Sequence, residues 1–451
     1  MASTEIKAQS FTRGESSSPD LSDGGFSPDS FGINLTKTKG MLYFTESATE
    51  RAGATLTGNI IASCVDPALT GNDAYYIADD GSFYTYSGTT FTEKRAAAAN
   101  YTYQLGTSDM IPFNDGNFYF TSKTTIGQFN NNMGTVTEDW WSGLDSSYRH
   151  PIEVVEKKVF VGDKNLILYY DGTTSGTAFT LPAGQNVTSL RKHPNGTTLL
   201  AFTGGTADFS HTRNGSGKVY YCDPTLQGAA VDGWSREVEL EAQVEGTRNV
   251  GGTIFATWGK NVGIFNGNGL DPFTKVLETS GTTYSQSMTN MEDIFVVRDG
   301  RFVLCYGNIG AGNVWWKLHR EAVDNINNLH YKGDNVLLIA TDDDDLNEID
   351  LDNAGNNGQF RTNRMTYGSE VEIRRFDLIH DETTASTTKV VYSEIDLAGS
   401  NNIIEEKSYS TATRFARFPA NIKTDMFQFG INLSIGDIGF KYIRIQHDPI
   451  K

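Results

Sequence analysis

The chain has 451 residues and a formal net charge of −18 at pH 7, and 38% of its residues are hydrophobic. This length allows two or three domains, although one all-β domain can be large. Glycine is frequent, with 46 residues, and proline is scarce, with 11, which is typical of many tight turns joining short strands. The acidic balance argues against a sequence-specific nucleic-acid reader and against a phosphate-binding groove, because both need clustered Lys and Arg.

The N-terminal part of the chain divides into two segments. Residues 1–30 are rich in Ser and Gly and hold few apolar groups, so we expect a flexible N-terminal arm, either free or docked onto a neighbouring subunit. Residues 31–66 contain two or three β-runs, within FGINLTKTKGMLYF and ATLTGNIIASCV. We predict that this β segment either closes a ring of blades or pairs with the C-terminal region.

A repeated hairpin pattern organises the middle of the chain. Two β-runs, Ile294–Val297 and Phe302–Tyr306, flank an Asp299-Gly300 turn, which is a strong hairpin signal. The first turns of seven such units lie at Gly81, Gly116, Lys157, Gly196, Gly252, Asp293 and Asp334. Degenerate repeats of about 40 residues with three or four short strands each, as here with one longer interval, indicate a β-propeller. We therefore predict about seven blades over residues 67–353.

Longer alternating strands follow from residue 358. Apolar residues recur there at period two, as in Phe427, Phe429, Ile431 and Leu433, so residues 358–451 predict a β-sandwich-like C-terminal domain. From Phe360 onward 12 Lys and Arg balance 12 Asp and Glu, whereas residues 1–359 carry 25 against 43. Five arginines of this domain either meet the acidic propeller or lie at solvated sheet edges: Arg374, Arg375, Arg414, Arg417 and Arg444.

Several loop features allow two readings. The acidic run Asp342–Asp345 with Glu348 predicts a solvated turn or a cation site, and it lacks the alternate ligands and the glycine of an EF-hand loop. The pairs Trp140-Trp141 and Trp315-Trp316 predict one packed and one outward ring each, because adjacent residues of a strand face opposite ways. An outward ring serves a subunit contact or, as the alternative, a sugar.

No catalytic pattern stands out. The seven histidines show no paired metal spacing, and the G-x-S-x-G elbow, the sialidase turn and the WD40 signature are absent. A glycosidase needs a pair of carboxylates, but with 55 Asp and Glu residues some pair can always be found, so such a pair does not indicate this activity. We therefore assign no catalytic, cofactor-binding or metal-binding residues, and we predict a protein that is not an enzyme and has no cofactor. Cys64, Cys222 and Cys305 are predicted to be buried small hydrophobes.

Targeting signals are also missing. The N-terminus, MASTEIKAQS, lacks the basic-then-apolar pattern of a signal peptide, and no apolar run approaches the roughly 18 residues of a membrane span. We expect a protein made in a cytoplasm, without a membrane anchor.

The two ends of the chain resemble virion proteins of tailed bacteriophages. The closing stretch MFQFGINLSIGDIGFKYIRIQHDP contains Phe427-Gln428-Phe429 and the run Tyr442–Gln446, a form familiar in such proteins. The opening NLTKTKGMLYFTES is similar to the start of the hub or nozzle proteins of short-tailed phages. The resemblance covers about the first 65 and last 90 residues, and the middle matches in architecture alone.

The resemblance implies a structural protein of the virion tail, synthesised in the host cytoplasm. Its expected partners are its own copies in a hexameric ring and other tail proteins, namely the adaptor and the fibres or spikes, with DNA only as cargo in the channel. In that ring we expect part of the acid excess on the lumen, where it repels phosphate and keeps DNA mobile; an even spread for solubility is the alternative. The alternative functions are a glycan-binding receptor-recognition protein of a tail tip and a polysaccharide-degrading propeller enzyme.

Overall fold

The fold is known from a computed structural model. The structure describes residues 2–7, 14–15, 25–26, 30–37, 42–45, 48–50, 56–65, 74–88, 90–97, 101–205, 216–226, 233–277, 283–308, 312–322, 324–352, 358–361, 365–380, 387–395, 401–410, 415–435 and 440–450. Within these ranges the regular structure is β-strand, apart from two short 3₁₀ turns, η3 (Pro224–Leu226) and η4 (Ser285–Ser287). Contacts divide the chain into two units, one of residues 50–301 and 323–348 and one of residues 1–49, 302–322 and 349–451.

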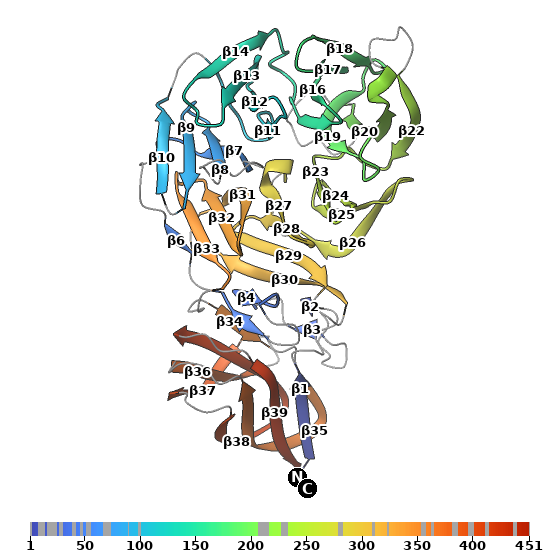
Figure 1. The fold of residues 1–451 in the computed structure, drawn as a ribbon. Coiled ribbons are helices and arrows are strands. Elements are labelled where there is room, and N and C mark those ends of the chain that lie inside the picture. Colours follow the sequence, from blue (N-terminus) through green and yellow to red (C-terminus); the bar gives the residue numbers. More distant parts are fainter. Residues whose placement is uncertain are drawn as a thin grey trace. The chain divides into compact units, whose positions relative to one another are not determined.

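The first unit is a β-propeller, whose blades follow one another in chain order from blue to orange in Figure 1. Each of the first five blades is a four-stranded antiparallel sheet of consecutive strands. These strands are β7 (Ile60–Val65), β8 (Ala74–Ala78), β9 (Phe83–Ser87), β10 (Thr90–Arg95), β11 (Met110–Pro112), β12 (Asn117–Thr121), β13 (Thr125–Asn130), β14 (Val136–Ser142), β15 (Ile152–Val155), β16 (Lys158–Asp163), β17 (Leu166–Tyr170), β18 (Ser175–Thr180), β19 (Asn186–Lys192), β20 (Leu199–Gly204), β21 (Gly217–Cys222), β22 (Trp234–Leu240), β23 (Gly246–Val250), β24 (Thr253–Trp258), β25 (Asn261–Phe265) and β26 (Leu270–Val276).

The last two blades close the ring. The sixth contributes β27 (Met288–Met291) and β28 (Ile294–Asp299) to this unit, and the seventh contains β31 (Ile326–Gly333), β32 (Val336–Thr341) and β33 (Leu346–Asp350). Strand β6 (Thr49–Glu50), from before the first blade, completes the seventh sheet, which is one of the two roles expected for residues 31–66. The first strands of the seven blades contact one another in sequence, and β31 contacts β7. A closed ring of seven first strands results.

Aromatic side chains fill the space between blades. Between the first and second blades, Phe83 and Phe120 lie with their ring centroids 5.0 Å apart, and Phe118 stacks on Phe129 at the same distance. Phe120 lies opposite Gly127 on the paired strand β13, where a side chain would collide with the ring. Alternating strands therefore bury large rings on both faces of a blade, and stacking against the neighbouring blades keeps those rings from water.

One position recurs near the end of the second strand of every blade. It is always Thr or Asp, and it occurs seven times, at Asp79, Thr121, Asp163, Thr203, Thr257, Asp299 and Thr341. Thr121 Oγ1 accepts a bond from the N–H of Asp109 at 3.0 Å and donates to the carbonyl of His150 at 2.9 Å. This position thus ties the chain just before a first strand to the next blade.

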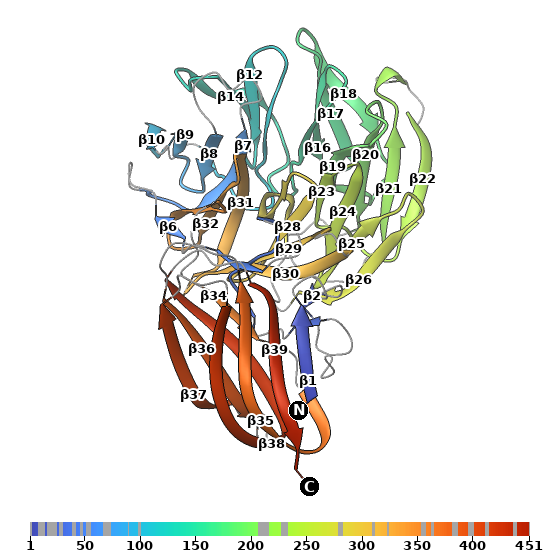
Figure 2. The same ribbon diagram turned by 60° about the horizontal axis from the view of Figure 1, so that its bottom comes forward.

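The second unit holds the C-terminal β-domain and both ends of the chain. Its seven-stranded antiparallel sheet has the order β1-β39-β35-β38-β36-β37, with β34 also paired to β38, and Figure 2 shows these long strands side by side. The strands are β1 (Ala2–Lys7), β34 (Gly358–Arg361), β35 (Met365–His380), β36 (Thr387–Ile395), β37 (Asn401–Ser410), β38 (Phe415–Ile435) and β39 (Phe440–Pro449). The β-sandwich-like domain is thus built on one hydrogen-bonded sheet.

Shorter strands complete this unit. They are β2 (Gly14–Glu15), β3 (Gly25–Phe26), β4 (Ile33–Asn34), β5 (Tyr43–Phe44), β29 (Phe302–Asn308) and β30 (Asn313–Arg320). β29 pairs with β30, β2 joins β30 in parallel, and β4 pairs with β5. The predicted fold class, an all-β chain with a propeller of about seven blades and a β-rich C-terminal domain, is confirmed.

The N-terminus differs from the predicted flexible arm. Residues Ala2–Lys7 form β1, which is paired over its whole length with β39, and Glu5 lies 2.8 Å from the guanidinium of Arg444. Main-chain hydrogen bonds at a sheet edge can order a segment that has few apolar side chains, and composition alone does not reveal them. The other described parts of residues 1–30 are β2, β3 and Ser30.

Candidate functional site

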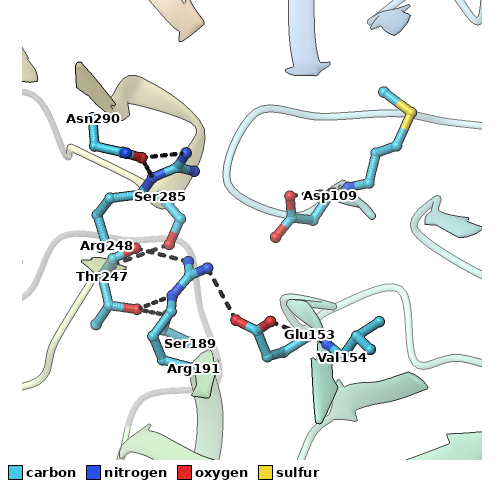
Figure 3. Close-up of polar contacts among 10 residues, drawn as sticks. Asp109, Glu153, Val154, Ser189, Arg191, Thr247, Arg248, Ser285 and Asn290 are labelled. Carbon is cyan, nitrogen blue, oxygen red and sulfur yellow. Dashed lines mark hydrogen bonds and ion pairs between the residues drawn. The ribbon is translucent and has the colours of Figure 1, made fainter. Parts of the chain in front are cut away.

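A polar cavity of about 330 Å³ lies inside the ring of first strands. All seven first strands or the residues beside them line it, from Ser63 on β7 to His330 on β31. Both walls carry charged groups, and the closest are shown in Figure 3. Pockets of this size, with a few convergent polar groups, are the usual place of a binding site in a folded domain.

Arg191 on β19 holds one wall of the cavity together. Its guanidinium donates to the carboxylate of Glu153 at 3.2 Å, to the hydroxyl of Thr247 at 3.0 Å and to the carbonyl of Thr247 at 2.7 Å. Ser189 also bonds the Thr247 hydroxyl, at 2.6 Å. Arg191 therefore links the third, fourth and fifth blades, and its charge is balanced by Glu153.

Arg248 on β23 has a different environment. Its Nε and Nη2 donate to the amide oxygen of Asn290 at 3.2 and 3.0 Å. Among the residues that the structure describes, no carboxylate lies within ion-pair distance of Arg248. Burial and the nearby charge of Arg191 lower the pKa of Arg248 to about 10, so the guanidinium still carries its charge at neutral pH. The neutral amide of Asn290 does not balance this charge.

Asp109 faces the two arginines from just before β11 (Figure 3). The N–H of Met110 donates to one of its carboxylate oxygens at 2.9 Å. Burial raises the pKa of Asp109 to about 6, although the positive charge of Arg191 opposes this shift. At neutral pH the carboxylate is mostly ionised, and it gains a proton in mildly acidic solution.

His330 on β31 is buried at the cavity with one ring nitrogen unused. Ser63 Oγ donates to the amide oxygen of Asn328 at 2.8 Å and lies 3.1 Å from Nδ1 of His330. Since the hydroxyl has one hydrogen, the hydrogen of the second bond belongs to Nδ1, and Nε2 carries a lone pair. Within the described ranges Nε2 has no hydrogen-bond partner. Burial and the charge of Arg248 lower the pKa of His330 to about 3, so the ring is neutral.

The features singled out in the sequence lie elsewhere. Asp342, from the acidic run, accepts bonds from Asn325 at 2.8 and 2.9 Å, and Glu348 accepts a bond from the hydroxyl of Tyr86. Within the parts of the chain described, no group of three or more His, Cys, Asp or Glu is gathered to hold a metal ion. Asp342 thus bonds within the seventh blade, and Glu348, on β33, bonds the first blade.

The tryptophan pairs are more enclosed than predicted. Trp315 and Trp316 on β30 are both buried, at 7% and 0% exposure, so the expected outward ring is wrong for this pair. In the sheet, β29 pairs with one edge of β30 and β2 with the other, where Gly14 lies opposite Trp315. Trp140 packs its ring edge against Tyr170 at 4.7 Å, and both it and Trp141 are half-buried. Each of these four rings is buried or half-buried, so none offers a fully exposed face for stacking on a sugar.

The arginines of the C-terminal domain pair locally. Arg374 contacts Glu372 at 2.7 Å, Arg375 contacts Asp377 at 3.5 Å, and Arg444 contacts Glu5. Arg414 and the side chain of Arg417 lie outside the described residues. The three cysteines are free and buried, as predicted. In the described part of the chain no helix is long and apolar enough to cross a membrane.

The cavity residues escaped the sequence analysis for a definite reason. Glu153, Arg191, Arg248 and His330 come from four first strands, and only ring closure brings these strands together. Glu153 is the one polar residue of the apolar run IEVV, whereas Arg191, Arg248 and His330 lie in strands with other polar residues, such as GTRNV for Arg248. A charged residue on the innermost strand of several repeats is the signal that would have indicated a shared axial site.

The comparisons with known proteins concern the fold. No family model and no curated protein matches the chain. Among solved structures it is similar to YCF48 bound to a D1 peptide, with a TM-score of 0.46, 10% identity, and coverage of 67% of this chain and 95% of the other. It is also similar to the WD40 β-propeller domain of Doa1, with a TM-score of 0.46, 10% identity, and coverage of 68% and 97%. The fold itself defines the chain as a β-propeller protein with an additional β-domain.

Proposed function

We propose that the protein is a structural component of a phage tail that forms a ring, a nozzle or hub, around the DNA exit channel. The support from the sequence is the resemblance of its two ends to such virion proteins and the acid excess of residues 1–359. The support from the fold is β1, an N-terminal strand that forms one edge of the C-terminal sheet.

That strand, β1, is the observation that carries the proposal. It forms one edge of the C-terminal sheet, where its partner among the described strands is β39, from Ala2 opposite His447 to Lys7 opposite Tyr442. A strand added to an edge from a distant part of the chain can equally add to the same edge of another copy, because the main-chain bonds are identical. Strand exchange of this kind builds closed rings from identical subunits.

The test is the oligomeric state of the full-length protein. Negative-stain electron microscopy and light scattering over a concentration series should show rings of about six chains. Deleting residues 1–9 removes β1 and should shift the population towards single chains, whereas Glu5→Gln, which keeps the strand, should leave the rings intact. Single chains at every concentration, or rings unaffected by the deletion, would contradict the proposed role of β1.

A further inference from the structure

Two side chains that line the axial cavity, Arg248 and His330, have polar groups whose partners among the described residues are weak or missing. Arg248 is a half-buried cation whose hydrogen-bond partner among the described residues is the neutral amide of Asn290. His330, at 5% exposure, has an Nε2 lone pair for which the described part of the chain supplies no donor. Buried polar groups are normally satisfied, and a buried cation normally has an anionic partner. The cavity therefore calls for a ligand that brings an anion to Arg248 and a hydrogen-bond donor to His330.

The carboxylate groups near the arginines restrict the chemical class of the ligand further. Figure 3 shows the carboxylate of Asp109 on the side facing Arg191 and Arg248, while the carboxylate of Glu153 is paired with Arg191. A multiply charged anion such as phosphate would be repelled by these carboxylates. A ligand with one carboxylate at one end and hydroxyl groups at the other matches both walls, since ionised Asp and Glu only accept hydrogen bonds.

At the end of the ligand away from its carboxylate, an amino group is less suitable than hydroxyl groups. Arg191 already neutralises Glu153 at 3.2 Å, and burial together with the positive charge of Arg248 disfavours a proton on His330. A ligand ammonium beside His330 would meet the same repulsion. Hydroxyl groups of a ligand can donate to Asp109 and to His330 Nε2 without adding a charge.

We propose that this cavity binds a single acidic sugar unit, with its carboxylate against Arg248 and its hydroxyl groups against Asp109 and His330. The volume of about 330 Å³ lies within the range of about 300–1,000 Å³ of small-molecule pockets and suits one monosaccharide. Arg191, which lines the cavity, keeps 14% of its side-chain surface exposed. The inference is independent of ring formation.

The experiment measures binding to the full-length protein by isothermal titration calorimetry at pH 7.5. The probes are glucuronate, glucose as the matched neutral sugar, and glutamate as a carboxylate with an ammonium group. Saturable binding of glucuronate, at least tenfold tighter than of the other two, is expected. Failure of glucuronate to bind, equal binding of glucose, or tighter binding of glutamate would overturn the proposal without the use of any variant.

Variants then locate the site. Arg248→Gln should weaken glucuronate binding at least tenfold, because the guanidinium charge is lost. Arg236→Gln, on β22, is the matched control, since Arg236 is exposed and bonds Asn268 away from the cavity. Equal affinity of Arg248→Gln and the unaltered protein would place the sugar elsewhere and reject the site. If Arg248→Gln fails to fold, Asp109→Asn, which removes the carboxylate that accepts from the ligand hydroxyl groups, should weaken glucuronate binding in the same measurement, and an unchanged affinity would reject the site.

Discussion

The hydroxyl of Tyr86 on β9 donates a hydrogen bond to the carboxylate of Glu348 on β33, and this bond joins the first blade of the propeller to the last. Both residues are buried, and they come from parts of the chain 262 residues apart. Where a ring is closed without a covalent link, such a bond contributes to stability in addition to the strand β6 that completes the last sheet.

Replacing this hydroxyl should weaken the propeller. Tyr86→Phe keeps the ring and removes the bond, leaving a buried carboxylate with one partner fewer, so the free energy of unfolding should fall by about 1–2 kcal/mol. Urea denaturation followed by tryptophan fluorescence measures it. Tyr148→Phe, at a half-buried tyrosine on a loop, is the control and should change stability by less than about 0.5 kcal/mol. Equal losses in the two variants would refute a specific role of the Tyr86 bond.

Two cavity residues should give opposite contributions to the pH dependence of stability. The pKa of His330 is lowered to about 3, so between about pH 6.5 and 3 the unfolded chain binds a proton that the native one does not, and acid destabilises the fold. The pKa of Asp109 is raised to about 6, so between about pH 6 and 4 the native protein binds the extra proton, and acid stabilises it.

Substitution should separate these contributions. Each group changes the free energy of unfolding by at most about 1.4 kcal/mol per pH unit within its window. Asp109→Asn removes the stabilising contribution, so stability should fall more steeply than in the unaltered protein between pH 6 and 4. The stability of the His330→Gln variant should fall less steeply than that of the unaltered protein as the pH is lowered. Urea denaturation at pH 7.5, 6.5, 5.5 and 4.5 gives the slopes, and unchanged slopes in both variants would disprove the assignment.

Gly127 tests the packing between the first two blades. A Cβ there would collide with the ring of Phe120, and that ring is itself held against Phe83. Gly127→Ala should therefore destabilise the protein by about 1–3 kcal/mol through overpacking. Gly269→Ala is the matched control, because a Cβ at Gly269 meets nothing within 4 Å. Thermal unfolding of the two variants gives the comparison, and equal melting temperatures would show that Phe120 moves aside freely.

The architecture could be read from the sequence because its signals are local. A tight turn needs residues that tolerate positive φ, and Asp334 and Asn335, at φ +48° and +58°, make such a turn between β31 and β32. The turn signals indicate seven units with uneven spacing. The Thr or Asp near the end of each second strand recurs at a more regular interval, and Thr121 shows why: its hydroxyl bonds two segments at once.

The features that the sequence did not reveal depend on contacts between distant segments of the chain. The pairing of β1 with β39 joins the two ends of the chain, and nothing in the composition of residues 1–30 indicates it. The cavity depends on the direction in which each first strand points a single polar residue, such as Arg248 towards the axis. A slip of one residue in register would reverse that direction, so the pattern of a lone charged residue in an apolar run cannot settle it.

The last prediction concerns the acid excess of the propeller part of the chain. If the proposed ring surrounds DNA, the side chains facing its channel should carry more Asp and Glu than Lys and Arg, because repulsion between carboxylate and phosphate keeps DNA from adhering. This repulsion acts over a screening length of about 8 Å at physiological salt, so only acids close to the DNA path contribute. The C-terminal domain, with 12 basic and 12 acidic residues from Phe360 onward, should instead face neighbouring proteins. Electron cryomicroscopy of assembled rings gives the count of channel-facing charges. A neutral or basic lumen would reject the repulsion and leave the acids as an evenly spread aid to solubility.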